Sequence, residues 1–145
     1  MKKTKAAFRA FREECGLTQQ EIADEADVRV MTVKNWENPN KPNSVVPDDI
    51  WQWLLALRGA MYQDAREIVE QIVSTLPEGA KDLYLNYYRT QEELDAVQLP
   101  DADEPVGYVN ARMRLVGQML DKTEIHYSYR YRSEQDEQDE QDEQE

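Results

Sequence analysis

Residues 17–37 constrain the fold more than any other stretch, because their pattern fits two short helices joined by a tight turn. Thr18 can cap the first helix, and Glu21 three residues later completes a capping-box pattern. Asp27 falls at the reversal, where it tolerates the left-handed backbone that such a turn needs. The positions expected to face inward are apolar: Ile22, Ala23, Ala26, Val28, Val33 and Trp36.

Two crossed helices joined by a short turn form a helix-turn-helix, whose second helix can enter the major groove of DNA. The chain of 145 residues fits one domain, or one small module with an extension. Its formal net charge is −13, yet residues 1–58 carry nine basic and nine acidic side chains. Residues 134–145 carry eight acidic side chains and none basic. The acidic excess therefore lies away from the two helices.

Several other classes of protein find no support in the sequence. The single Cys15 excludes an internal disulfide framework and fits a reducing compartment. No apolar run approaches the length that spans a membrane, so we expect a cytoplasmic protein. His126 is the only histidine, and neither metal-ligand spacing nor a glycine-rich phosphate loop occurs. We therefore expect no enzyme activity, no cofactor and no metal.

Residues 5–58 resemble the helix-turn-helix family of phage repressors and Cro-like regulators. The resemblance rests on residues 17–23 (LTQQEIA), on Val28 and on residues 32–37 (TVKNWE). Two positions depart from the family pattern, because Asp27 stands where glycine is usual and Arg29 where a capping Ser or Thr is usual. Arg29 weakens the cap but adds a cation at the end of the helix that faces DNA.

The resemblance implies that six side chains read the bases: Arg29, Val30, Met31, Thr32, Lys34 and Asn35. Asn35 can pair with adenine through two hydrogen bonds, while the apolar side chains and the Thr32 methyl can pack on thymine methyl groups. Arg29 and Lys34 reach either guanine or only phosphates. Because Val30 and Met31 are apolar, DNA shape is expected to contribute beside direct readout. The alternative is a helix-turn-helix that serves only protein contacts, with these side chains solvated.

Four further side chains are expected to contact phosphates: Gln19, Lys41, Asn43 and Lys5. Gln19 opens the first helix of the pair, where the helix dipole favours an anion. Lys41 and Asn43 lie in a loop that contains two prolines and follows Glu37. Lys5 opens a basic amphipathic helix that ends at Gly16.

A long apolar stripe begins after Pro47, which suits the first turn of a helix together with Asp48 and Asp49. From there to Leu76 no proline occurs, and apolar residues recur at spacings of three and four. The first turns of this helix are expected to cover the helix-turn-helix core. Beyond Gly59 the stripe needs another surface, and the pattern leaves open whether Gly59 kinks or splits the helix.

The segment from 81 to 132 alternates between strand and helix patterns. Strands are predicted over 81–89 and 125–132, with helices over 90–97 and 108–122 between them. Two strands alone are marginal in water, so their aromatic faces favour pairing across a two-fold axis. The alternative is that both strands lie on the long helix within one monomer. For the dimer we expect contacts from Tyr127, Tyr129, Leu85 and Tyr87.

The last thirteen residues repeat Glu-Gln-Asp and contain nothing apolar, so the tail 133–145 is predicted to be disordered. Most such runs only add solubility, because like charges repel one another and extend the chain. The alternative is a DNA mimic that competes with phosphates for the basic face.

Together these patterns predict a mainly α protein with a small β part. Residues 1–58 form a five-helix-type helix-turn-helix domain, residues 59–132 a long linking helix with a β-α-α-β dimerisation segment, and residues 133–145 the tail. The order of motifs over 1–132 is more loosely similar to small phage and prophage regulators, including anti-CRISPR-associated repressors. That resemblance implies a homodimer that binds double-stranded DNA at an inverted repeat and represses its own operon. The alternative is an antitoxin-like module that binds a protein partner and uses DNA for autoregulation.

Overall fold

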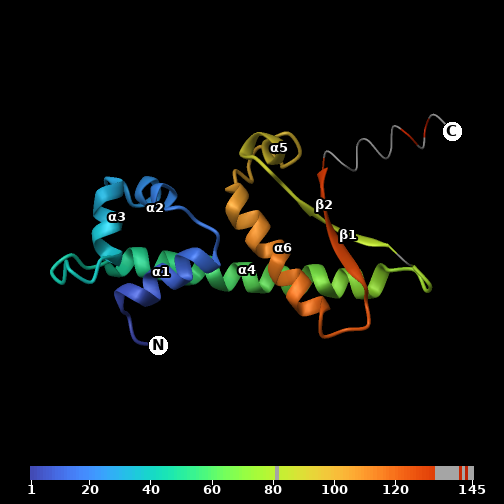
Figure 1. Cartoon of the computed structure of the whole chain (residues 1–145), viewed down its shortest axis with the longest axis horizontal. Coiled ribbons are helices and arrows are strands. Elements are labelled where there is room, and N and C mark those ends of the chain that lie inside the picture. The colour runs from blue at the N-terminus through green and yellow to red at the C-terminus, as the bar shows by residue number, and fades with distance from the viewer. Residues whose placement is uncertain (81, 133–140, 142, 144–145) are drawn as a thin grey trace. The chain divides into compact units, whose positions relative to one another are not determined.

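The computed structural model describes residues 1–80, 82–132, 141 and 143 (Figure 1). The elements are α1 (Lys5–Glu14), α2 (Gln19–Ala26), α3 (Val30–Glu37), α4 (Asp48–Thr75), β1 (Leu83–Tyr87), α5 (Gln91–Asp95), α6 (Val106–Leu120) and β2 (Tyr127–Tyr131). The fold is mainly α with a small β part, as predicted. The predicted disordered tail, 133–145, lies outside the described residues except for positions 141 and 143.

The chain divides into two compact units, residues 1–63 (unit 1) and residues 64–145 (unit 2). The sequence predicts the end of the first domain at residue 58, five residues before the end of unit 1. Unit 1 consists of α1, α2, α3 and the N-terminal part of α4, so the expected five-helix count does not apply to it. None of the helices in the described residues is long and apolar enough to cross a membrane.

Aromatic packing organises the core of unit 1. The Phe8 ring of α1 meets the Trp36 ring of α3 edge-on at 6.0 Å between centroids, and the Trp51 ring of α4 at 5.4 Å. Such edge-to-face pairs add to the gain from burying the ring area itself. Because Phe8 is fully buried among both indoles, one side chain of α1 fixes α3 against the start of α4.

The apolar seam between α2 and α3 forms largely as predicted, since Ile22, Ala23, Val33 and Trp36 are all buried. Val28 is the exception. It lies in the turn before α3 and leaves 36% of its surface exposed, so the expectation that it faces inward is wrong. A turn residue has no helical neighbours to set the direction of its side chain, which is why a helical spacing rule fails there.

Helix α4 runs through Gly59 without interruption over 28 residues. No atom lies within 4 Å of the position that a Cβ on Gly59 would take, so open space surrounds this glycine. The predicted start is confirmed, because Asp48 and Asp49 occupy the first turn directly after Pro47. Within unit 2, Ala65 of α4 is fully buried and belongs to the core of that unit.

Unit 2 follows the predicted β-α-α-β order, and its two strands pair with each other in parallel. Leu83 lies opposite Tyr127, and Leu85 lies opposite Tyr129. Parallel strands need a long crossover, which the segment containing α5 and α6 provides. The core beneath the sheet is made by Ala65, Leu85, Val116 and Leu120.

The two strands thus pair within one chain, as in the alternative that places both strands in one monomer. Leu85 is only 4% exposed and packs against α4 and α6 of its own unit, so it offers no surface to a second protomer. The assignment of Leu85 to a dimer contact therefore needs correction. Its strand pattern showed that Leu85 faces a partner, but the partner is the unit's own helical layer.

Candidate nucleic-acid interface

Local hydrogen bonds fix both the start of α2 and the turn between α2 and α3. The Thr18 hydroxyl accepts from the Glu21 N–H at 3.0 Å, and the Glu21 carboxylate accepts from the Thr18 N–H at 2.9 Å. These two bonds complete the predicted capping box. Asp27 then takes the left-handed conformation, with φ 54° and ψ 48°, and the Val28 N–H donates to the Ala23 carbonyl at 3.0 Å. The reversal therefore forms as predicted.

Helix α3 has one buried side and one open side. Val33 and Trp36 anchor it in the core, whereas Met31 leaves 58% of its surface exposed. Arg29 and Lys34 are exposed as well. Val30, Thr32 and Asn35 are partly buried. The structure thus brings all six expected base-reading residues together at α3 and its N-cap, three of them exposed and three partly buried.

The polar side chains of this open side are unengaged in the described part of the chain. Arg29 forms the N-cap of α3 but makes no capping hydrogen bond, which agrees with the expected weak cap. In residues 1–80 and 82–132, the side chains of Thr32, Lys34 and Asn35 also make no hydrogen bond or ion pair. Their donors and acceptors are therefore available to an external partner without breaking an internal bond.

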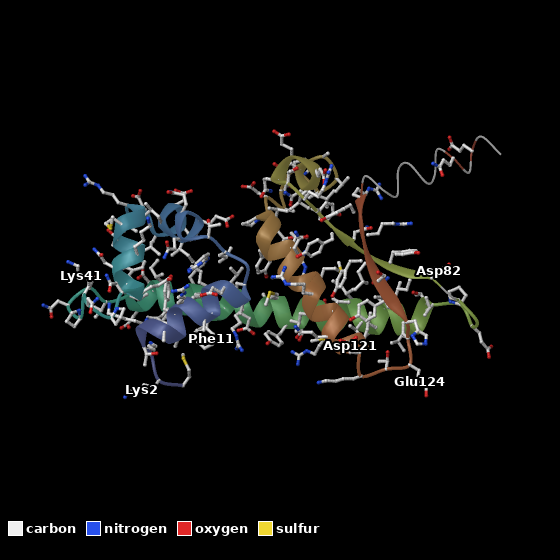
Figure 2. The ribbon with its side chains drawn as sticks, viewed as in Figure 1. Lys2, Phe11, Lys41, Asp82, Asp121 and Glu124 are labelled. Carbon is white, nitrogen blue, oxygen red and sulfur yellow. The ribbon has the colours of Figure 1, made fainter. Side chains whose placement is uncertain are left out.

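The loop between α3 and α4 presents Lys41, which is exposed (Figure 2). Asn43 in the same loop is exposed as well. Two turns hold the backbone of this loop, because the Lys41 N–H donates to the Asn38 carbonyl at 3.1 Å and the Ser44 N–H donates to the Lys41 carbonyl at 3.1 Å. The Asn40 N–H also donates to the Asn38 side chain at 2.9 Å. A loop ordered in this way loses less conformational entropy when its side chains meet a phosphate.

Gln19 is held at the start of α2 by a buried ion pair. Its amide donates to Glu37 Oε1 at 3.2 Å, and the same carboxylate binds Arg12 through Nε at 2.7 Å and Nη2 at 2.9 Å. Arg12 also donates to the Leu17 carbonyl at 3.0 Å. This network joins α1, the start of α2 and the end of α3. Sequence reasoning missed it, although a Glu directly after a buried Trp was a usable signal.

Lys5 takes a structural position. Its ammonium donates to the carbonyls of Asn35 at 3.0 Å, Trp36 at 3.3 Å and Ser44 at 2.5 Å. An ammonium has three N–H groups, so all of them are used. A cation also suits the negative end of the helix dipole. Lys5 thus caps the C-terminal end of α3, and the structure adds nothing in favour of the predicted phosphate contact.

The tyrosines expected at a dimer surface form a row of edge-to-face rings in unit 2. Tyr129 lies 5.8 Å from Tyr87 and 5.8 Å from Tyr127 between ring centroids. The Tyr127 hydroxyl donates to Asp121 at 2.7 Å, and this hydrogen bond raises the pKa of Tyr127 to about 12. Tyr129 leaves 40% of its surface exposed. Only part of the row is therefore open to a partner.

Residues 8–42 match the HTH_3 family model, which describes a helix-turn-helix. The matched segment contains α2, α3 and most of α1. The match identifies this segment as a helix-turn-helix of the Cro/CI-like family and supports a DNA-binding regulator of that type. A comparison with curated proteins finds no match. The family match ends at residue 42, so it does not bear on the looser resemblance over residues 1–132.

Proposed function

We propose that the protein is a homodimeric repressor that binds an inverted-repeat operator by placing α3 in the major groove. The observation that carries the proposal is the open side of α3, where the side chains of Arg29, Lys34 and Asn35 make no hydrogen bond or ion pair in the described residues. The opposite side of α3 is locked in the core by Val33 and Trp36. A rigid helix with free polar groups is the geometry that groove readers use.

The chemistry of each side chain suggests its role. The Asn35 amide can donate to adenine N7 and accept from its N6 amino group, which distinguishes adenine from the other bases. Arg29 and Lys34 can bind guanine edges or neighbouring phosphates. The exposed Met31, with Val30 and the Thr32 methyl, supplies apolar contact for thymine methyl groups.

Phosphate contacts are proposed for Gln19, Lys41 and Asn43. Gln19 uses one of its amide hydrogens on Glu37, so the second amide hydrogen and the backbone N–H groups of Gln19 and Gln20 remain for a phosphate. Lys41 and Asn43 extend from the ordered loop on the other end of α3. Together these groups would clamp the backbone on both sides of the groove.

The zero net charge of residues 1–58 favours a second protomer. Because residues 1–58 have as many acidic as basic side chains, nonspecific attraction to DNA is small. Linking two units makes the second binding event intramolecular and raises the overall affinity. In unit 2, Tyr84, Tyr129 and Tyr131 are each about 40% exposed, and each strand of the described two-stranded sheet has one unpaired edge. These features support unit 2 as the dimer surface.

The test is selection of bound sites from random double-stranded DNA, followed by native mass measurement of the complex. The proposal expects an enriched inverted repeat that carries two protomers. A reporter gene placed behind that site should be expressed less when the protein is present. No enriched palindrome, or one protomer per site, would overturn the operator and the dimer respectively, and increased expression would overturn the repressor role.

A further inference from the structure

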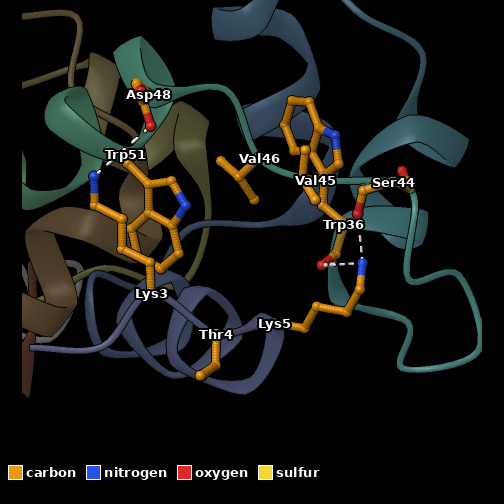
Figure 3. A pocket seen from close by; sticks show the side chains of 9 residues that line it. All are labelled: Lys3, Thr4, Lys5, Trp36, Ser44, Val45, Val46, Asp48 and Trp51. Carbon is orange, nitrogen blue, oxygen red and sulfur yellow. Dashed lines mark hydrogen bonds and ion pairs between the residues drawn. The ribbon is translucent and has the colours of Figure 1, made fainter.

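A cavity of about 280 Å³ lies in unit 1 beside the loop that joins α3 to α4, and base reading makes no use of it (Figure 3). Its walls come from residues 3–5 at the start of α1, from Trp36 and Trp51, from the loop residues 44–46, and from Asp48 at the start of α4. We propose that this cavity binds a small organic carboxylate with an apolar body, and that the bound ligand acts as an effector of operator binding.

The size and walls of the cavity set the body of the ligand. A volume of 280 Å³ equals the space of about nine waters at ~30 Å³ each, so the ligand is a small molecule. Trp36 and Trp51 close two sides, and each is only 4% exposed. Val45 lines the cavity yet leaves 68% of its surface exposed. An apolar group in the cavity would cover Val45 and gain the free energy of that burial.

The charges at the cavity set the polar end of the ligand. Lys5 is committed to three backbone carbonyls, so it holds the wall and has no donor left. Among the described residues, Lys3 is bound only to Asp48, with 3.8 Å between Nζ and Oδ1. Both side chains are exposed, Asp48 at 89%, and such a long pair in water is weak. Lys3 can therefore turn to a ligand carboxylate while Asp48 stays hydrated.

The effector role follows from what Lys5 holds. Its ammonium donates to the Ser44 carbonyl, on the cavity side, and to the Trp36 carbonyl at the end of α3 (Figure 3). It also donates to the Asn35 carbonyl in the same helix end. A ligand packed against Trp36 and the 44–48 loop therefore shifts or stiffens the helix end that carries Asn35. This second step rests on the proposed DNA reading, whereas binding to the cavity does not.

Binding is tested on the full chain with phenylacetate as the probe, and with phenylacetamide and phenethylammonium as its neutral and cationic counterparts. The amide NMR shifts of Ser44, Val45, Val46 and Asp48 and the indole N–H signals of Trp36 and Trp51 report the cavity, and Trp53 is the internal reference. We expect saturable shifts with phenylacetate and about fivefold weaker binding of phenylacetamide. No saturable shift at the cavity, or tighter binding of phenethylammonium, would overturn the proposal.

Two matched variants separate a direct contact from general charge. K3Q should weaken phenylacetate about fivefold and leave phenylacetamide unchanged. K2Q removes the same charge from the neighbouring residue, which does not line the cavity, and should bind phenylacetate as the wild type does. V45S should weaken both probes, because it removes the apolar contact. Equal losses in K2Q and K3Q would show only long-range attraction and would contradict the assigned site.

The effector step is tested by measuring operator affinity with and without saturating phenylacetate. We expect at least about a threefold change, which K3Q abolishes at the same probe concentration. If the probe binds the cavity but operator affinity stays constant, the effector role is wrong and the binding site stands. If no operator is found at all, the proposed function fails, while the NMR titration still decides whether the cavity binds carboxylates.

Discussion

Arg12 of α1 and Glu37 at the end of α3 form a bidentate ion pair inside unit 1. Arg12 Nε lies 2.7 Å from Glu37 Oε2, and Nη2 lies 2.9 Å from Oε1. The two side chains are 12% and 5% exposed. Because the same carboxylate accepts from Gln19, the pair also fixes the start of α2, where a phosphate contact is proposed.

Breaking this pair should destabilise unit 1 strongly. Arg12→Ala leaves the Glu37 carboxylate buried without its partner, which costs about 3 kcal/mol of unfolding free energy. The double variant R12M/E37M removes both charges and should recover most of that loss. Urea unfolding followed by tryptophan fluorescence measures the effect, since all three tryptophans lie in residues 1–63.

The matched control for this experiment is Arg9→Ala, on the same helix. Arg9 pairs with Glu13 at 2.6 Å, but both side chains are more than half exposed. An exposed pair contributes little, so this variant should unfold like the wild type. A double variant as unstable as Arg12→Ala would contradict the explanation, because the loss would then come from the missing pair rather than from an unpaired charge.

Asn35→Ala should relax sequence preference at one position of each half-site. Losing a bidentate contact to adenine reduces the binding free energy by about 1–3 kcal/mol at sites with the preferred base and changes it little at sites with another base. Lys41→Gln is the contrast, because a lost phosphate contact weakens all DNA alike and lowers the salt slope by about 1 per protomer. Site selection and salt titration measure the two effects. Unchanged preference in Asn35→Ala would remove this residue from the base-reading set.

Local chemistry explains what the sequence could predict. The capping box of Thr18 and Glu21 involves residues three apart, and the left-handed turn depends on Asp27 alone. The open side of α3 follows from helical spacing once Val33 and Trp36 are placed inside. These features need no knowledge of distant segments, so a single sequence is enough to find them.

Features that depend on distant segments were not predicted. Lys5 bonds to carbonyls 30 to 39 residues away, and the composition near it favoured a solvated basic face instead. The strands beginning at Leu83 and Tyr127 alternate clearly, but alternation does not say which strand lies beside which. Leu85 was therefore assigned to a second protomer, although the helical layer of its own unit covers it.

The contact of Glu14 with α4 should make unit 1 sensitive to acid. The Glu14 carboxylate accepts two hydrogen bonds from α4. Arg58 Nε donates to it at 2.7 Å, and the Tyr62 hydroxyl donates to it at 2.6 Å. Partial burial raises the pKa of Glu14, but these two hydrogen bonds and the Arg58 charge outweigh it and lower the pKa below its ordinary value. Because the pKa is lower in the folded state, the ionised Glu14 stabilises the fold at pH values above its unfolded-state pKa. This stabilisation is lost as the pH falls through the folded-state pKa.

Glu14→Gln is therefore expected to reduce stability at pH 7 and to flatten the loss of stability below about pH 5. The loss at pH 7 should be about 1 kcal/mol, a value discounted because the pair is partly exposed. Tryptophan-detected unfolding at a series of pH values gives both quantities. Parallel pH curves for the variant and the wild type would show that Glu14 does not carry the acid sensitivity.

Gly117 on α6 should tolerate no side chain, because the rings of β2 pack directly on it. A Cβ at this position would clash with the Tyr129 hydroxyl and lie 3.0 Å from the Tyr127 hydroxyl. Alanine normally stabilises a helix by up to about 1 kcal/mol relative to glycine. Overpacking against two fixed rings costs about 1–3 kcal/mol and should prevail, so Gly117→Ala destabilises unit 2.

Two further variants make this prediction sharp. Gly59→Ala, in a helix with open space around it, should gain the full helical preference and raise stability. Adding Tyr129→Phe to Gly117→Ala removes the clashing hydroxyl and should restore part of the loss. Amide hydrogen exchange over residues 82–132 measures the stability of unit 2. If the amides of residues 82–132 exchange as slowly in Gly117→Ala as in the wild type, or more slowly, the prediction is wrong. The tyrosines of β2 would then not pack closely on α6.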